Sequence, residues 1–255
     1  MKNVYFLSDA HLGSRAIAHG RTQERRLVNF LDSIKHNAAA VYLLGDIFDF
    51  WYEFKLVVPK GYTRFLGKIS ELTDLGVEVH FFIGNHDIWC GDYLEKECGV
   101  TIHRQPLTCE IYGKEFFLAH GDGLGDKDAK FKLLRSMFHS TTLRTLFSTI
   151  HPRWSIELGL EWAKHSRLKR EGGKEPEYMG EDKEPLVLFT KNYLKDHLDI
   201  NYFIYGHRHI MLDLMLSRTS RMLILGDWIQ DFSYAVFDGE NMFLEQYVEG
   251  ESQYS

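Results

Sequence analysis

Aspartate, histidine and asparagine residues gather at five points of the chain, each directly after a short apolar run. The five clusters are Asp9-Ala10-His11, Asp46-Ile47-Phe48-Asp49, Asn85-His86-Asp87, His120 and His207-Arg208-His209. Carboxylate, imidazole and amide groups in combination suit divalent metals such as Mn²⁺, Fe²⁺ or Zn²⁺. One such cluster is a weak signal, but five clusters after five apolar runs predict a metal centre.

Two of the clusters share one spacing, with a ligand type at every second residue. Asp9 and His11 form one pair, and His207 and His209 form the other. Alternate residues at the end of a strand point to the same side, so each pair is predicted to present both side chains together.

The remaining candidates extend the prediction to two ions. Asp46 is a candidate bridge because a carboxylate has two oxygens, and Asn85 and His120 would complete a second site. Two ions held ~3.5–4 Å apart form the usual clamp for displacement at phosphorus. Two carboxylates against two dications leave the centre net positive, which suits a phosphate.

The apolar runs that precede the clusters predict buried strands at residues 4–7, 41–44, 77–83, 116–119 and 202–205. Between the first three, apolar residues at helical spacing predict helices around residues 27–34 and 65–72. This alternation predicts a layered α/β core, whose strand ends are where such sheets place ligands. Near the end of the chain, residues 221–225, 234–237 and 241–248 are expected to be antiparallel strands, with Asp238-Gly239 as a hairpin turn.

The composition is that of a globular protein, with 44% hydrophobic and 26% charged residues among 255, which excludes disorder and coiled coil. One domain over residues 1–255 is expected, with a helical insertion at about 125–185 that lies over the site. No apolar run approaches the length of a membrane span, and the N-terminus has no signal-peptide core, so a cytoplasmic protein is expected.

Charge is unevenly distributed along the chain, whose formal net charge is −6. Residues 127–174 contain 11 lysine and arginine residues against four acidic ones, so the remainder is strongly acidic. A local basic segment indicates an anionic ligand or surface nearby, and an acidic remainder argues against nucleic-acid binding.

Taken together, these motifs resemble those of the calcineurin-like metallophosphoesterases, in the same order over nearly the whole chain. The resemblance implies a two-sheet αββα sandwich that holds two divalent ions, with Mn²⁺ the expected metal. It implies that His86, steered by Asp87 and next to Asn85, faces the substrate phosphate. Its metal ligands would be Asp9, His11, Asp46 and His209 for one ion, and Asp46, Asn85, His120 and His207 for the other.

Further motifs resemble the branch of this family that hydrolyses UDP-2,3-diacylglucosamine to UMP and 2,3-diacylglucosamine 1-phosphate in lipid A biosynthesis. They are residues 44–51, 120–124 and 225–228. The resemblance makes the helical insertion a lid and implies peripheral association with an anionic inner-membrane surface. This chain has His86 where the best-known members carry arginine. The substrate contacts that it implies are Asp128, Ser166, Arg167, Arg170 and Lys174.

Two other functions remain open from the sequence. A phosphodiesterase or nucleotide phosphatase of the same fold would act on a soluble substrate, and a scaffold would keep the fold without catalysis. The apolar residues of the insertion would either line an acyl groove or pack against the core. The oligomeric state is also open.

Overall fold

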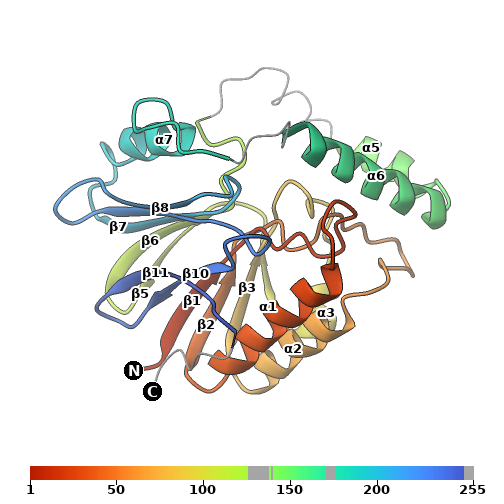
Figure 1. Ribbon diagram of the computed structural model, residues 1–255, viewed down its shortest axis with the longest axis horizontal. Coiled ribbons are helices and arrows are strands. Elements are labelled where there is room, and N and C mark those ends of the chain that lie inside the picture. Colours follow the sequence, from red (N-terminus) through yellow and green to blue (C-terminus); the bar gives the residue numbers. More distant parts are fainter. Residues whose placement is uncertain (126–137, 139, 171–175, 250–255) are drawn as a thin grey trace.

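Two β-sheets stacked face to face form the centre of the protein, as Figure 1 shows for the computed structural model. The structure describes residues 1–125, 138, 140–170 and 176–249, and of residues 166–170 it describes the backbone alone. Helices cover the outer faces of both sheets, so the predicted αββα sandwich is confirmed.

The first sheet has six strands in the order β11-β10-β1-β2-β3-β4. These strands are β1 (Asn3–Leu7), β2 (Ala38–Leu43), β3 (Glu78–Phe82), β4 (Thr101–His103), β10 (Ser233–Phe237) and β11 (Met242–Gln246). Strands β1 to β4 are parallel, and β10 is antiparallel to both β1 and β11. Parallel strands with covered faces need apolar residues on both sides, which explains the continuous apolar runs in the sequence.

The second sheet has five strands in the order β5-β6-β7-β9-β8. Its strands are β5 (Leu107–Ile111), β6 (Lys114–Ala119), β7 (Ile200–Tyr205), β8 (Met211–Met215) and β9 (Arg221–Leu225). We expected β9 to be antiparallel like β10 and β11, and this was wrong for one neighbour, since β9 is parallel to β7 and antiparallel to β8. The hairpin between β10 and β11 is confirmed.

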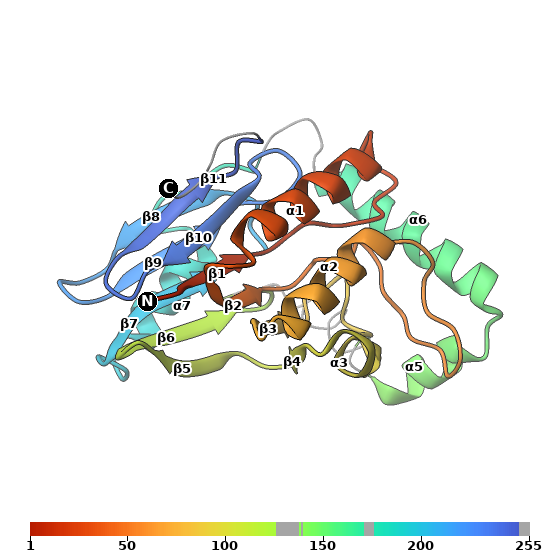
Figure 2. The ribbon, with the colours of Figure 1, turned by 90° about the horizontal axis from the view of Figure 1, so that it is seen from below.

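Three apolar cores separate the four layers. Helices α1 (Gly20–Ile34), α2 (Thr63–Asp74) and α3 (Tyr93–Cys98) pack on the first sheet through one core (Figure 2). A second core, which includes Phe6 and Phe116, lies between the sheets. The third core joins the second sheet to α7 (Pro185–Tyr193).

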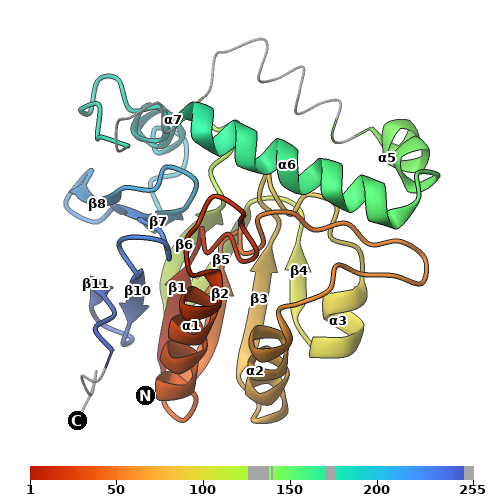
Figure 3. The ribbon, with the colours of Figure 1, turned by 45° about the vertical axis from the view of Figure 1, so that its right-hand side comes forward.

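Two further helices, α5 (Thr141–Ser148) and α6 (Pro152–Arg170), lie within the predicted insertion. Figure 3 shows α6 crossing above the strand ends of the first sheet. The Phe147 ring on α5 contacts those of Phe50, Tyr52 and Trp89 at centroid distances of 4.9–6.4 Å. Phe147 is therefore a packing residue that docks α5 on the core.

Helix α6 is attached to the loop that follows β1. Arg15 on that loop lies 2.5 Å from Glu157 and 2.7 Å from Glu161, which are one helical turn apart. An α6 glycine, Gly159, faces the Phe50 ring so closely that a Cβ would overlap it. These contacts place α6 against the loops that carry the polar clusters. The bounds of the insertion and its role as a lid stay predictions.

Candidate metal centre

The five polar clusters meet at one end of the two sheets. They lie in the loops after β1, β2, β3, β6 and β7, where the carboxyl ends of parallel strands converge. Because β6 and β7 belong to the second sheet, the site spans both sheets. The structure brings together all seven predicted ligands, which are Asp9, His11, Asp46, Asn85, His120, His207 and His209.

Backbone conformation, and not strand alternation, aims most of these side chains. Asp9, His11, Asp46, His207 and His209 all have φ between 43° and 68°, the left-handed region. A residue with a Cβ held there costs about 1–3 kcal/mol and persists where the surrounding structure imposes it. The expectation that Asp9 and His11 align because alternate strand residues point alike was wrong, since β1 ends at Leu7.

The first group consists of Asp9, His11 and His209. The Nε2 atoms of the two histidines lie 3.3 Å apart, and Asp9 Oδ1 lies 3.7 Å from His11 Nε2 and 3.4 Å from His209 Nε2. The other oxygen of Asp9 accepts a hydrogen bond from the backbone N–H of His207. Asp9 Oδ1 is buried and accepts no hydrogen bond from the part of the chain that the structure describes, so this oxygen faces the two imidazoles.

Asp46 lies between this group and a second one. Its Oδ1 accepts the backbone N–H of His86, and its Oδ2 lies 3.7 Å from His11 Nε2 and 3.4 Å from His120 Nε2. A single oxygen therefore faces both groups, which is the geometry a bridging ligand needs.

The second group adds Asn85, His120 and His207. Asn85 Oδ1 lies 3.3 Å from His120 Nε2, and His207 offers a ring nitrogen within 4.8 Å of the ligand atoms of Asp46 and His120. His120 Nδ1 donates to the Leu44 carbonyl at 2.8 Å. This bond fixes the ring so that Nε2 is the atom turned into the site.

These separations fit ligands of divalent ions. Two ligand atoms that each lie ~2.1 Å from one ion are ~3.0–3.4 Å apart in octahedral or tetrahedral coordination. The separations among the ring nitrogens and carboxylate oxygens of Asp9, His11, His209, Asp46 and His120 are 3.3–3.7 Å, close to that range. The donor set therefore fits two divalent metal ions.

Electrostatics support the same conclusion. Burial opposes the charge of Asp46, yet the nearby His120 and His86 hold the pKa of that carboxyl well below its ordinary value. Burial likewise lowers the pKa of His120, but the Asp46 charge outweighs it and raises that pKa well above the ordinary value. The carboxylates of Asp9 and Asp46 are fully buried, so positive charge beside them is strongly stabilising, and divalent cations would supply it.

Two positions in the motifs require glycine, because a carboxylate from another loop lies too close to leave room for a Cβ. A Cβ at Gly84 would overlap the Asp46 carboxylate, and a Cβ at Gly206 would lie 2.5 Å from Asp9 Oδ2. The glycines that precede Asn85 and His207 therefore let neighbouring loops reach the buried carboxylates.

The expectation that Asp87 steers His86 was wrong. The Asp87 carboxylate accepts backbone N–H bonds from Gly84 and Ile47, at 2.6 and 2.9 Å, and so ties the loops after β2 and β3 together. His86 Nδ1 instead donates to the carbonyl of Asp49 at 2.9 Å. Burial lowers the pKa of His86 to about 4 and raises that of Asp87 to about 7.

Sequence reasoning missed two carboxylates that position the histidines. Asp227 lies 3.0 Å from His209 Nδ1 and accepts three backbone N–H bonds from the residues that follow it. Such carboxylate–histidine contacts orient metal-binding imidazoles. The second, Glu184, is fully buried and binds Arg208 at 2.6 Å, between His207 and His209. Asp227 lies within the motif at residues 225–228, but the sequence motif predicted no role for its carboxylate.

The predicted substrate contacts lie in or next to the helical insertion. Asp128 and Lys174 fall outside the described residues. Ser166, Arg167 and Arg170 lie on the last turns of α6, where the side chains are outside the described part.

A two-sheet sandwich with aspartate, histidine and asparagine residues at its strand ends defines a class of metal-dependent phosphoesterases. The sequence profile of the calcineurin-like phosphoesterases matches residues 2–211, and the chain belongs to this family. It is a metal-dependent hydrolase.

Curated relatives match over nearly their full lengths. A UDP-2,3-diacylglucosamine hydrolase of Porphyromonas gingivalis is 43% identical over 95% of this chain and 96% of that protein. One of Neisseria meningitidis serogroup C is 28% identical over 91% of this chain and 92% of that protein. Among solved structures, a phosphoesterase of E. coli, Yfce, is a distant likeness with a TM-score of 0.43, 14% identity and coverage of 94% of this chain and 90% of that chain.

Proposed function

We propose that this protein cleaves the diphosphate of UDP-2,3-diacylglucosamine, in lipid A biosynthesis. The products would be UMP and 2,3-diacylglucosamine 1-phosphate. The observation that carries the proposal is the 43% identity, over 95% of the chain, to a hydrolase named for that substrate. The buried Asp/His/Asn centre supports it, because displacement at a diphosphate uses two clamped cations.

We assign one ion to Asp9, His11, Asp46 and His209, and a second to Asp46, Asn85, His120 and His207. Two divalent cations bound there would activate water for attack at phosphorus and neutralise phosphate charge. We propose Mn²⁺, because the ligands are oxygen and imidazole donors without a thiolate. Asp46 would be the ligand shared by the two sites, because its Oδ2 faces both His11 and His120 while its Oδ1 accepts the backbone N–H of His86.

His86 and Asn85 are the residues that we place against the phosphate. Because His86 Nδ1 donates to the Asp49 carbonyl, Nε2 is the atom turned towards the centre. The His86 and His11 rings are perpendicular at 4.7 Å, which keeps the imidazole beside the ligands. With a pKa of about 4, His86 carries no proton on Nε2 until an anion lies beside it. A bound phosphate would raise this pKa, and His86 protonated at Nε2 would then stabilise charge on the phosphate or protonate the leaving oxygen. Asp87 supports this from a distance, by tying together the loops on which Asp46 and His86 lie.

The substrate head group is assigned to the insertion, with Asp128, Ser166, Arg167, Arg170 and Lys174 as its contacts. Basic residues there suit a diphosphate, and the segment 127–174 has 11 lysine and arginine residues against four acidic ones. Phe147 does not belong to an acyl groove in this proposal, because it packs against Phe50, Tyr52 and Trp89.

An apolar stripe on α6, defined as Trp154, Leu158 and Trp162, supports peripheral membrane association at the inner membrane. These residues are four apart, so they share one helix face, and they are 68%, 60% and 42% exposed. Tryptophan and basic residues favour an anionic membrane interface. No helix among the described residues is long and apolar enough to cross a membrane.

Product analysis tests the proposal. Purified protein is incubated with UDP-2,3-diacylglucosamine and Mn²⁺, and products are identified by mass spectrometry. Equimolar UMP and 2,3-diacylglucosamine 1-phosphate, lost on chelation, are expected. Turnover of a soluble nucleotide diphosphate with no turnover of the lipid substrate would contradict the substrate and favour the soluble alternative.

A further inference from the structure

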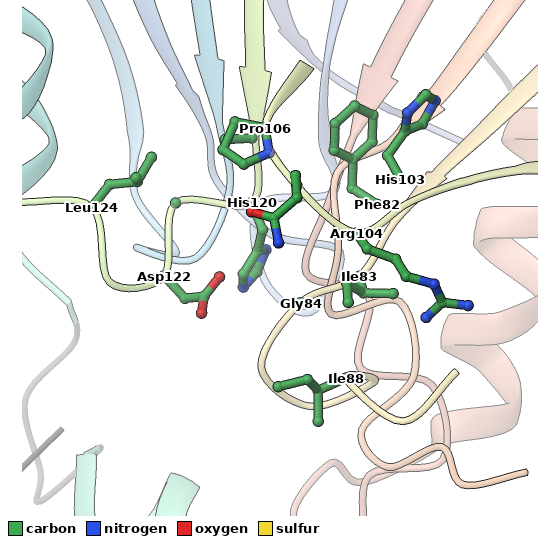
Figure 4. Close-up of a pocket in the computed structure, with 13 residues that line it drawn as sticks. Phe82, Ile83, Gly84, Ile88, His103, Arg104, Pro106, His120, Asp122 and Leu124 are labelled. Carbon is green, nitrogen blue, oxygen red and sulfur yellow. The ribbon is translucent and has the colours of Figure 1, made fainter. Parts of the chain in front are cut away.

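A pocket opens beside the metal centre (Figure 4). Its volume is about 180 Å³, and three loops line it, those after β3 and β6 and the one between β4 and β5. His120 forms part of its wall, and so does Gly84, which precedes Asn85. A molecule whose phosphate lies on the metal centre would therefore place one neighbouring group at this pocket.

The lining combines apolar and polar side chains. Ile88, Pro106 and Leu124 supply apolar surface, while Gln105 and Asp122 supply polar groups. The Gln105 amide both donates and accepts hydrogen bonds, and it makes no side-chain hydrogen bond to any described residue. A flat ring with a polar edge fits such a lining better than an aliphatic chain does.

The loop that carries Gln105 is held in place. Arg104 Nη1 and Nη2 donate to the carbonyls of Cys90 and Gly91, both at 2.7 Å. These bonds join the loop between β4 and β5 to the loop after β3. The pocket is therefore a built feature whose walls are fixed relative to the metal centre.

We propose that this pocket binds the pyrimidine nucleoside of the substrate. The inference rests on the proposed function, in which the substrate has a diacylated sugar on one side of the diphosphate and a nucleoside on the other. Two long acyl chains exceed a space of about 180 Å³, whereas one pyrimidine ring fits it. The Gln105 amide matches the donor–acceptor edge of uracil, and Asp122 is an acceptor for ribose hydroxyls.

Product inhibition tests this without the lipid substrate. UMP, AMP and inorganic phosphate are compared as inhibitors of bis(p-nitrophenyl) phosphate hydrolysis by the Mn²⁺-loaded protein. We expect UMP to inhibit more strongly than AMP and phosphate, because the pocket admits one ring. The variant Gln105→Leu should raise the inhibition constant of UMP about tenfold, the effect of a lost hydrogen bond. Inhibition by inorganic phosphate should stay unchanged, because phosphate carries no ring to fill the pocket.

Gln246→Leu on the edge strand β11 is the matched control, since Gln246 is exposed and far from the pocket in the fold. An unchanged UMP constant in Gln105→Leu, or equal inhibition by UMP and AMP, would overturn the assignment of the pocket. Failure of the wild-type protein to hydrolyse UDP-2,3-diacylglucosamine would instead overturn the proposed function, because UMP binding is measured independently of it.

Discussion

At the scale of single residues, Asp46 lies between the first and the second group of candidate ligands. One oxygen lies 3.7 Å from His11 and 3.4 Å from His120, while the other holds the backbone of His86. Removing this carboxylate would leave both groups without their shared ligand and free the loop after β3.

Asp46→Ala should therefore lose activity by orders of magnitude. Metal per chain, measured by plasma mass spectrometry, should fall below the value near two that we expect for the wild type. Asp74→Ala is the control, because Asp74 is exposed at the end of α2. Wild-type turnover by Asp46→Ala would contradict the bridging role.

His86→Gln separates catalysis from metal binding. Because His86 is assigned to the phosphate and not to an ion, kcat should fall by roughly 10²–10⁴-fold while bound metal stays at the wild-type level. His36→Gln, at an exposed position, should change neither quantity. Loss of one ion from His86→Gln would make this histidine a ligand.

The candidate metal ligands, which the structure brings together, were predictable from sequence because their motifs repeat after each apolar run. The residues that orient them were not. Asp227 and Glu184 are single carboxylates whose roles depend on His209 and Arg208, which only the fold brings to them. Asp87 is a further residue whose role was not predictable. It is adjacent to His86 in sequence, but its carboxylate binds the backbone of Gly84, and His86 binds the carbonyl of Asp49.

At the scale of elements, the buried strands and the edge strand β11 were predictable, whereas the edge strands β4, β5 and β8 were not. β1 and β7 are continuous apolar runs, whereas β5 and β8 lie at sheet edges and alternate between partly buried and exposed residues. β4 has only three residues. An edge strand buries one face, so its sequence lacks the run that identifies a central strand.

The segment before α7 is anchored to the loop of His207 and His209 by one buried ion pair. Glu184 is fully buried and Arg208 is 26% exposed. Glu184→Gln would leave the Arg208 charge without its partner, so we expect the free energy of unfolding to fall by about 2 kcal/mol.

Urea denaturation measures this change. Glu181→Gln is the matched control on the same segment, because Glu181 pairs with Lys191 at the surface and little change is expected there. Equal stability of Glu184→Gln and the wild type would show that the pair does not anchor this loop.

The apolar stripe of α6 belongs to the same scale. Trp154→Ser combined with Leu158→Ser should weaken binding to phosphatidylglycerol vesicles at least tenfold, because two side chains lose burial in the interface. Added salt should weaken wild-type binding further. The melting temperature should stay unchanged, since both residues are exposed.

Vesicle co-sedimentation measures the binding, with Leu198→Ser as the control. Leu198 is 75% exposed but lies outside the insertion. A membrane role for the stripe would be contradicted if vesicle binding fell equally in the double variant and in Leu198→Ser, or if it fell in neither.

At the scale of the whole molecule, both sheets contribute loops to one site, and two helices lie beside it. Loops from both sheets form the metal centre, and α5 and α6 lie beside it through contacts with Arg15 and the aromatic residues of the loops after β2 and β3. A layered α/β core was predictable from strand and helix periodicity, whereas the two-sheet sandwich followed from the resemblance to the calcineurin-like phosphoesterases. The docking of α5 was not, because helix packing and an acyl groove would use the same apolar residues.

Turnover of UDP-2,3-diacylglucosamine in ¹⁸O-labelled water tests the central claim most directly. We propose that water attacks the phosphorus on the UMP side. Its oxygen should then enter UMP, while the bond between that phosphorus and the bridging oxygen breaks and the bridging oxygen leaves with the lipid phosphate. The account predicts one ¹⁸O in UMP and none in 2,3-diacylglucosamine 1-phosphate. Label in the lipid phosphate would contradict the orientation of attack, and the absence of both products would contradict the proposed reaction.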